Sequence, residues 1–195
     1  MDASAPSVET FEAVLPDEQA TLRLAAELAP VLEAGDMVAL TGGLGAGKTT
    51  FARALIRELA GDPSLEVPSP TFTLLQTYEL ERAPVVHVDF YRINDPEELR
   101  EFGWPDLAED AVTLVEWPER AGGTLPAERI EVELALAPEL GRDCRRLRLT
   151  ATGAPAARLR RLVALRRFLS EAGYETAERI PLQGDASTRI YERLR

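Results

Sequence analysis

The sequence contains very few of the residues that build metal sites and covalent catalytic sites. Its 195 residues include one cysteine, Cys144, one histidine, His87, and one lysine, Lys48. A single cysteine excludes an intrachain disulfide, and one cysteine with one histidine excludes a Cys/His zinc site. A catalytic triad built on histidine would have to use His87, which lies inside a strand pattern and is interpreted as structural. This cysteine usage favours a reduced, cytoplasmic protein.

Long apolar runs are also missing. No stretch approaches the roughly 20 apolar residues of a membrane span, and residues 1–16 have neither a basic flank nor an apolar core. With 45% hydrophobic and 28% charged residues, the composition is typical of a folded globular protein. We therefore expect neither a membrane span nor a secretion signal.

Positive charge is scarce in most of the chain. Residues 1–141 carry 9 basic and 27 acidic side chains, whereas residues 142–195 carry 13 basic and 6 acidic ones. An acidic body disfavours unaided binding to nucleic acid, because phosphate neutralisation supplies most non-specific affinity. The charge step, followed by a small-residue linker after Thr150, predicts a division into residues 1–150 and residues 151–195.

The single lysine stands in a phosphate-binding motif. Residues 42–49, GGLGAGKT, match G-x-x-x-x-G-K-[ST] between an apolar strand pattern (36–41) and an amphipathic helix pattern (48–60). Backbone N–H groups would surround the phosphates, Lys48 would bridge the β- and γ-phosphates, and the Thr49 hydroxyl would hold Mg²⁺. A glycine-rich turn without a ligand is the weaker alternative. The predicted nucleotide-binding residues here are Gly42, Gly43, Leu44, Gly45, Ala46, Gly47, Lys48, Thr49 and Thr50.

Other polar residues follow predicted strands near this motif. Asp89 and Glu116 each end an apolar strand, where an acid can orient a hydrated magnesium ion, although such an acid is often only a cap or a solvated side chain. Ser69 and Thr71 lie in a proline-rich loop that either senses the γ-phosphate or is merely a stiff connection. Trp117 either stacks on adenine or fills the core.

The order of patterns predicts an α/β fold with a mixed sheet, a parallel core, an antiparallel C-terminal edge and helices on both faces. Strand patterns at 71–80 and 83–91 form a predicted hairpin, and the alternating runs 129–136 and 144–150 form a second antiparallel pair. The remaining expectations are a helix over 17–34 capped by Asp17, a strand over 111–117, a helix start at Asp95, a basic helix over 156–174 and a terminal strand–turn–strand.

Several motifs in this order resemble the TsaE family, the small ATPases of bacterial tRNA threonylcarbamoyladenosine synthesis. The resemblance covers about two-thirds of the chain, and SPTFT, DFYR and VEWPER make it more specific than the P-loop alone. The matching segments are LPDEQAT (15–21), GGLGAGKTT (42–50), VPSPTFTLLQTY (67–78), HVDFYR (87–92), DPEELREFG (95–103), LVEWPER (114–120) and GR (141–142).

The resemblance implies a P-loop ATPase that uses ATP and Mg²⁺ and works with two proteins, TsaD and TsaB. That complex installs threonylcarbamoyl on adenosine 37 of ANN-reading tRNAs, so tRNA would be met only through the complex, and hydrolysis without the partners would be slow. Position by position, Thr49 and Glu116 would be magnesium ligands and Asp89 the Walker B acid. Ser69 to Thr71 would form a switch-like loop, with Lys48 and Thr71 among the catalytic residues. Glu18, Trp117 and Gly141 would lie near the nucleotide.

One position departs from the family, and one segment adds a second resemblance. The family often has Asp where this chain has Gly43, so no carboxylate acts there. Residues 181–194, PLQGDASTRIYERL, are similar to the start of aminoglycoside-phosphotransferase-like kinases. Residues 151–195 would then be a linker helix and the first part of a fused kinase. A small-molecule kinase and a nucleotide-gated adaptor are the alternative functions, and the sequence leaves the oligomeric state open.

Overall fold

The structure is a computed structural model that describes residues 6–101, 108–174, 177, 179–182 and 191–195. The chain divides into two compact units, residues 1–160 and residues 161–195. In chain order the elements are β1 (Val8–Leu15), α1 (Glu18–Leu28), the 3₁₀ turn η1 (Ala29–Val31), β2 (Met37–Thr41), α2 (Lys48–Ala60), β3 (Leu75–Tyr78), β4 (Val85–Asp89), α3 (Glu98–Glu101), β5 (Val112–Glu116), the 3₁₀ turn η2 (Pro118–Ala121), β6 (Ile130–Leu136), β7 (Arg145–Thr152), α5 (Ala154–Glu171), β8 (Arg179–Leu182) and β9 (Tyr191–Leu194).

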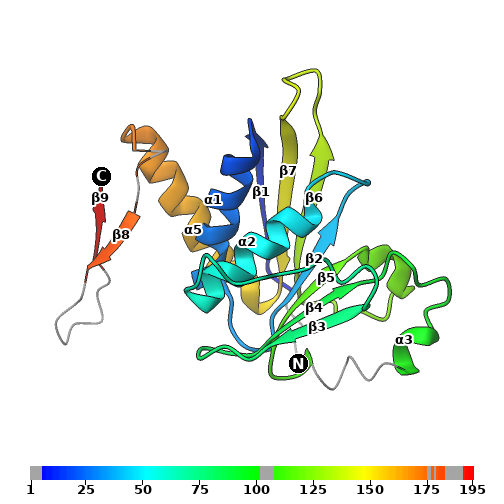
Figure 1. Cartoon of the computed structure of the whole chain (residues 1–195). Helices are drawn as coiled ribbons and strands as arrows, with labels where there is room; N and C mark the ends of the chain where they lie inside the picture. The colour runs from blue at the N-terminus through cyan, green and yellow to red at the C-terminus, as the bar shows by residue number, and fades with distance from the viewer. Residues whose placement is uncertain (1–5, 102–107, 175–176, 178, 183–190) are drawn as a thin grey trace. The chain divides into compact units, whose positions relative to one another are not determined.

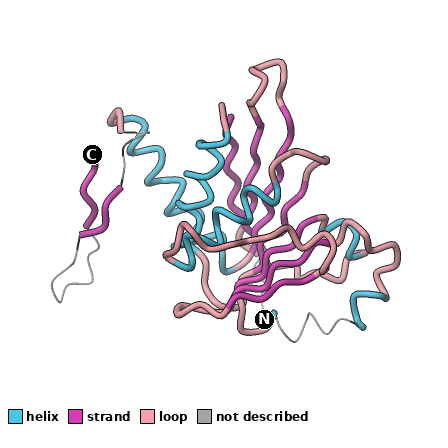
Figure 2. Tube along the Cα trace, in the orientation of Figure 1, coloured by secondary structure: helices cyan, strands magenta, loops and turns pink. Residues whose placement is uncertain are grey.

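A seven-stranded sheet in the order β1-β7-β6-β2-β5-β4-β3 forms the centre of the first unit (Figures 1 and 2). Strands β6, β2, β5 and β4 are parallel, whereas β7 and β1 run antiparallel on one side and β3 on the other. The predicted mixed sheet with a parallel core and an antiparallel edge is therefore confirmed. The parallel strands bring their carboxyl ends to one edge of the sheet.

Different elements cover the two faces of the parallel strands. Because of the strand registers, Val38, Leu114 and His87 share the face of Glu116, and the α2 residue Thr49 reaches this face to hydrogen-bond Glu116. The opposite face is an apolar cluster that also receives Leu99 of α3 and Ala121 of η2. Its buried members are Met37, Val86, Val88, Phe90, Ile93, Leu99, Ala111, Val115 and Ala121. Helices on both faces, as predicted, are confirmed.

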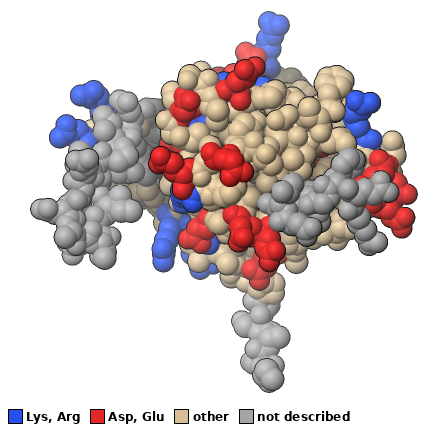
Figure 3. Space-filling view, turned by 60° about the horizontal axis from the view of Figure 1, so that its bottom comes forward, with Lys and Arg blue, Asp and Glu red and all other residues tan. Residues whose placement is uncertain are grey.

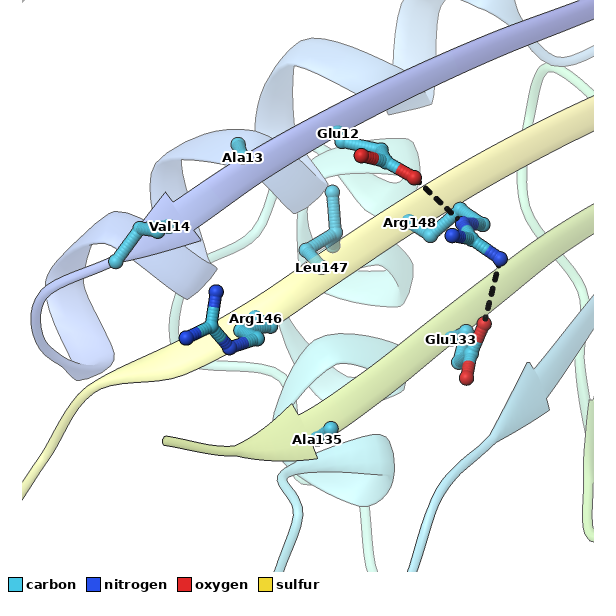
Figure 4. Close-up of a pocket in the computed structure, with 8 residues that line it drawn as sticks. All are labelled: Glu12, Ala13, Val14, Glu133, Ala135, Arg146, Leu147 and Arg148. Carbon is cyan, nitrogen blue, oxygen red and sulfur yellow. Dashed lines mark hydrogen bonds and ion pairs between the residues drawn. The ribbon is translucent and has the colours of Figure 1, made fainter. Parts of the chain in front are cut away.

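The antiparallel side of the sheet has a more open face. On this face the Arg148 guanidinium lies between two acidic side chains, Nε 2.7 Å from Glu12 on β1 and Nη1 3.9 Å from Glu133 on β6 (Figure 4). Val8 and Val14 of β1 are also about half exposed.

Elsewhere on the body, acidic side chains gather on the face in Figure 3 while basic ones lie mainly at its margins. The face in this view is therefore predominantly acidic, in agreement with the excess of acidic residues in residues 1–141.

Most of the predicted helices and strands are present near the predicted residues, and a few differ in length or were not predicted. The Asp17 carboxylate accepts a hydrogen bond from the Ala20 backbone N–H and caps α1 as predicted. That helix ends at Leu28 rather than at residue 34, because Pro30 forces a 3₁₀ turn. The strand predicted over 71–80 is shorter, because a turn that includes Leu74 in the left-handed region precedes β3. Strand β1 was not predicted at all.

The first residues of α5 belong to the first unit. The Arg158 guanidinium donates to both carboxylate oxygens of Asp36 at 2.6 Å and to Glu33 at 2.6 Å. Ala156 and Leu159 are fully buried. The second unit contains the rest of α5 and an antiparallel β8–β9 pair. Across both units, none of the described helices is long and apolar enough to span a membrane.

Candidate functional site

The turn between β2 and α2 (Figure 1) requires glycine at particular positions. Gly42 has a φ of 137°, and a Cβ there would lie 2.2 Å from the Leu134 carbonyl oxygen of the neighbouring strand. Gly47, at a φ of 108°, precedes α2, and its carbonyl accepts the first helical hydrogen bond from Phe51. The turn therefore presents backbone N–H groups at the N-terminus of a 13-residue helix, an arrangement that binds phosphate.

Lys48 is held inside this turn. Its side chain is 5% exposed, and its Nζ donates to the carbonyl oxygens of Gly42 at 2.7 Å and Gly43 at 3.0 Å. The same Nζ lies 3.7 Å from the centre of the Trp117 ring. Burial lowers the pKa of the Lys48 ammonium, and the negative charges of Glu116, Glu119 and Asp89 partly oppose this shift. The ammonium is thus partly dehydrated, which strengthens its attraction for phosphate, while the neighbouring acids partly balance its charge.

Two acids lie side by side beyond the lysine. Asp89 and Glu116 are register partners at the ends of the parallel strands β4 and β5, and each is 2% exposed. The Thr49 hydroxyl donates to Glu116 Oε2 at 2.8 Å, and the Thr71 hydroxyl donates to Asp89 Oδ2 at 2.6 Å. The structure therefore brings together five residues that the sequence predicted for the site, whereas the pairing of each threonine with a carboxylate was not predicted.

The loop that carries Thr71 is tightly folded. The Ser69 and Thr71 hydroxyls are hydrogen-bonded at 2.8 Å, and the Leu74 N–H donates to the Pro70 carbonyl at 2.6 Å. Phe72 in the same loop is 84% exposed. Asp89 Oδ1 also accepts from the Tyr91 N–H at 2.8 Å, so that both oxygens of this carboxylate are engaged. The loop conformation and the Asp89 carboxylate are thus directly linked.

Trp117 follows Glu116 with a left-handed backbone, at a φ of 58°. This conformation is uncommon for a large side chain and is characteristic of functional turns. Besides lying on Lys48, its ring is 5.0 Å from the Tyr91 ring. Covering the lysine is a role that the sequence did not suggest, and stacking on adenine stays a prediction.

Two further predicted residues lie toward the antiparallel side. Glu18 is exposed at the start of α1, and Gly141 lies in the turn before β7. The Cys144 thiol donates to the Pro16 carbonyl at 3.6 Å, which joins these two segments. Within the part of the chain that the structure describes, no hydrogen bond connects Glu18 or Gly141 to the paired threonines and acids. Their contact with a nucleotide stays a prediction.

Sequence reasoning missed two residues at the site. His87 was interpreted as structural, but its Nε2 lies 3.0 Å from Glu116 Oε1. Arg145 was not singled out, yet its Nε donates to the carbonyl of Ala46 in the phosphate-binding turn at 3.0 Å. Strand alternation could have indicated both residues. It places His87 on the same face of the strand as Asp89, and it places Arg145 on the opposite face from Arg146.

The donor set fits magnesium. Thr49, Asp89 and Glu116 offer hydroxyl and carboxylate oxygens, the ligands that Mg²⁺ prefers. Among the residues that the structure describes, no group of three or more His, Cys, Asp or Glu side chains could hold a metal ion by itself. A magnesium ion here would therefore take few protein ligands and complete its coordination with phosphate oxygens and water, as is usual at phosphoryl-transfer sites.

Several known proteins are similar to this chain in sequence or fold. The family model of the threonylcarbamoyl adenosine biosynthesis protein TsaE matches residues 15–144. The TsaE protein of Rickettsia felis is 40% identical over 131 residues, 67% of this chain and 76% of its own length. That of Haemophilus influenzae is 37% identical over 133 residues, 65% of this chain and 83% of its own. The crystal structure of Bacillus subtilis YdiB aligns with a TM-score of 0.60 at 28% identity, covering 86% of this chain and 98% of that one.

Proposed function

The chain belongs to the TsaE family of threonylcarbamoyl adenosine biosynthesis proteins, and on this premise we propose that it is a magnesium-dependent ATPase of tRNA modification. It hydrolyses ATP in a complex with TsaD and TsaB, which places threonylcarbamoyl on adenosine 37 of ANN-reading tRNAs. The observation that carries the proposal is the Thr49–Glu116 hydrogen bond at the start of α2, beside Lys48 and Asp89. We place the activity in the cytoplasm, where the free Cys144 thiol would stay reduced.

Each residue has a distinct part in this activity. The backbone N–H groups of residues 42–47 bind the phosphates, and the Lys48 ammonium lies where it can balance their charge. Thr49 and Glu116 hold the ion, and bound magnesium neutralises negative charge on the β- and γ-phosphate oxygens. Asp89 is held by Thr71 and the Tyr91 N–H, so a change in the loop of Thr71 changes the position of this acid.

Slow hydrolysis without partners is part of the proposal. Both oxygens of Asp89 accept hydrogen bonds from Thr71 and Tyr91, and both oxygens of Glu116 lie within hydrogen-bonding distance of Thr49 and His87. These contacts therefore hold each carboxylate in one position when the partners are absent. A partner that moved the loop of Thr71 would change this arrangement.

The test is ATP hydrolysis by the full chain, alone and with TsaB–TsaD. We expect the partners to raise the rate at least about tenfold, and Glu116→Gln, which keeps the shape but removes the charge, to lower the stimulated rate roughly 100-fold. Glu12→Gln is the matched control, because that carboxylate pairs with Arg148 on the open face of the sheet. Absence of stimulation despite ATP binding would contradict the proposal.

Two alternatives give different results. A small-molecule kinase, of the P-loop type or through the segment 151–195, would form ADP faster when hydroxyl-bearing metabolites are added. A nucleotide-gated adaptor would support tRNA modification with a variant that binds ATP but does not hydrolyse it. The division proposed with the ATPase is a catalytic region within residues 1–150, followed by a linker helix and the start of a kinase-like domain.

A further inference from the structure

His87 makes a contact that reaches the proposed magnesium site. It lies in the middle of β4, two residues before Asp89, and its side chain is 0% exposed. Its Nε2 is 3.0 Å from Glu116 Oε1, while Glu116 Oε2 accepts the Thr49 hydroxyl at 2.8 Å. The Glu116 carboxylate is therefore held at both oxygens, by residues from two different elements.

The surroundings of the imidazole indicate which nitrogen carries the proton. The Glu116 carboxylate is an acceptor, so Nε2 must be the donor. Nδ1 is buried and has no hydrogen-bond partner among the described residues. A proton on Nδ1 would be a buried donor without an acceptor, which is more costly than a bare ring nitrogen. The geometry is therefore that of an imidazole whose Nε2–H donates to Glu116.

We propose that His87 is a positioning residue for the magnesium site: its Nε2–H fixes Glu116 Oε1, so that Oε2 stays directed at Thr49 and the ion. This inference rests on the proposed function, since it assumes that Glu116 holds magnesium. Lys48 supplies the reason why Glu116 needs a second anchor. The Lys48 ammonium attracts the Glu116 charge, and a second hydrogen bond limits the rotation of a carboxylate that Thr49 alone would hold at one oxygen.

A purely structural role fits the surroundings of His87 poorly. On its own face of the sheet, Val85 and the parallel register partner Leu114 on β5 are apolar and buried. An apolar residue would fill this position without leaving a buried ring nitrogen unpaired. The carboxylate of Glu116 accounts for the polar side chain.

Nuclear magnetic resonance of the unaltered protein gives the first test. His87 is the only histidine, so every imidazole signal belongs to it. We expect ¹⁵N shifts of an imidazole that carries a proton on Nε2, and a change in these shifts when magnesium is added to the nucleotide-bound protein. An Nε2 without a proton, or an imidazole that does not respond to magnesium, would overturn the proposal.

Two amide variants give the second test. In His87→Gln the amide nitrogen is three bonds from Cβ, as Nε2 is in histidine, whereas in His87→Asn it is two bonds away and does not reach Glu116. We expect His87→Asn to lower the magnesium affinity of the ADP-bound protein about 10- to 100-fold, as for other residues that hydrogen-bond a metal ligand. In His87→Gln the magnesium affinity should stay within about threefold of that of the unaltered protein. Tryptophan fluorescence reports binding, because the Trp117 ring lies on Lys48, and the other tryptophan, Trp104, is replaced by phenylalanine in all the proteins compared.

The outcomes separate this inference from the proposed function. ADP affinity measured with a chelator should be the same in all three proteins, since the backbone and Lys48 bind the phosphates. Equal magnesium affinity in both variants, or equal loss in both, would overturn the role of His87 alone. If magnesium did not change the ADP affinity of the unaltered protein, the proposed magnesium site would be wrong, and the role of His87 would be wrong as well. If the variants do not fold, the magnetic resonance test still decides.

Discussion

Neighbouring glycines in the phosphate-binding turn face very different surroundings. A Cβ on Gly42 would lie 2.2 Å from the Leu134 carbonyl oxygen, and the φ of 137° is unfavourable for any other residue. A Cβ on Gly43 would meet nothing within 4 Å, and its backbone needs no positive φ. The surroundings therefore tolerate a side chain at Gly43 but not at Gly42.

We expect Gly42→Ala to destabilise the protein by roughly 2–5 kcal/mol and to abolish nucleotide binding, because both the strained backbone and the clash with β6 must be relieved. Gly43→Ala, the matched control, should change the free energy of unfolding by less than about 0.5 kcal/mol. Thermal unfolding and ADP titration measure both effects. Equal loss in the two variants would contradict this account of the turn.

At the scale of residues, the motif made most of the site predictable. The P-loop pattern identifies Lys48 and Thr49, and an acid at a strand end identifies Asp89 and Glu116, because each has a known partner in phosphate and magnesium chemistry. His87 has no such motif. Its contact with Glu116 depends on the register of β4 and β5, which local sequence does not determine, and so its position was predicted but its partner was not.

At the scale of elements, β7 shows how one strand serves both faces of the sheet. Arg145 donates from Nε to the Ala46 carbonyl in the phosphate-binding turn. The next residue, Arg146, points to the other face, where its guanidinium lies 2.7 Å from Glu139 and both side chains are more than half exposed. The alternation of the strand thus gives adjacent arginines unrelated surroundings.

We expect Arg145→Met to raise the Kd for ADP about fivefold, because loss of a hydrogen bond from a charged donor frees the Ala46 carbonyl and loosens the turn. Arg146→Met makes the same change in charge and should leave the Kd unchanged, since an exposed ion pair contributes little. Isothermal titration at two salt concentrations separates the two cases. If the variants weaken binding equally, general charge rather than the contact with Ala46 is responsible.

Strand β1 shows why a strand can be missed when only the sequence pattern is used. Its inward residues are Glu9, Phe11, Ala13 and Leu15, and its outward residues are Val8, Thr10, Glu12 and Val14. Each face mixes apolar and charged side chains, so the period-two pattern that reveals a strand is blurred. Pairing with β7 over its whole length, rather than its own pattern, keeps this segment extended.

At the scale of the whole molecule, contacts place the end of the first unit later than the charge step suggested. The change in charge near residue 141 and the linker after Thr150 predicted a division at 150, and the family match ends at residue 144. Composition cannot reveal that Arg158 returns to Asp36, 122 residues earlier in the chain. The compact unit that contains this contact extends to Arg160.

We therefore expect residues 1–160 to unfold at about the same temperature as the same unit in the full chain, and residues 1–152 to unfold about 10 °C lower. The shorter piece lacks the buried Leu159 and leaves Asp36, 9% exposed, without its guanidinium partner, a loss of at least about 3 kcal/mol. Within residues 1–160, Arg158→Met separates the ion pair from helix packing and should show part of the decrease. Equal thermal midpoints for the two lengths would mean that the start of α5 does not stabilise the first unit, and the division at residue 150 would then describe the folding unit better.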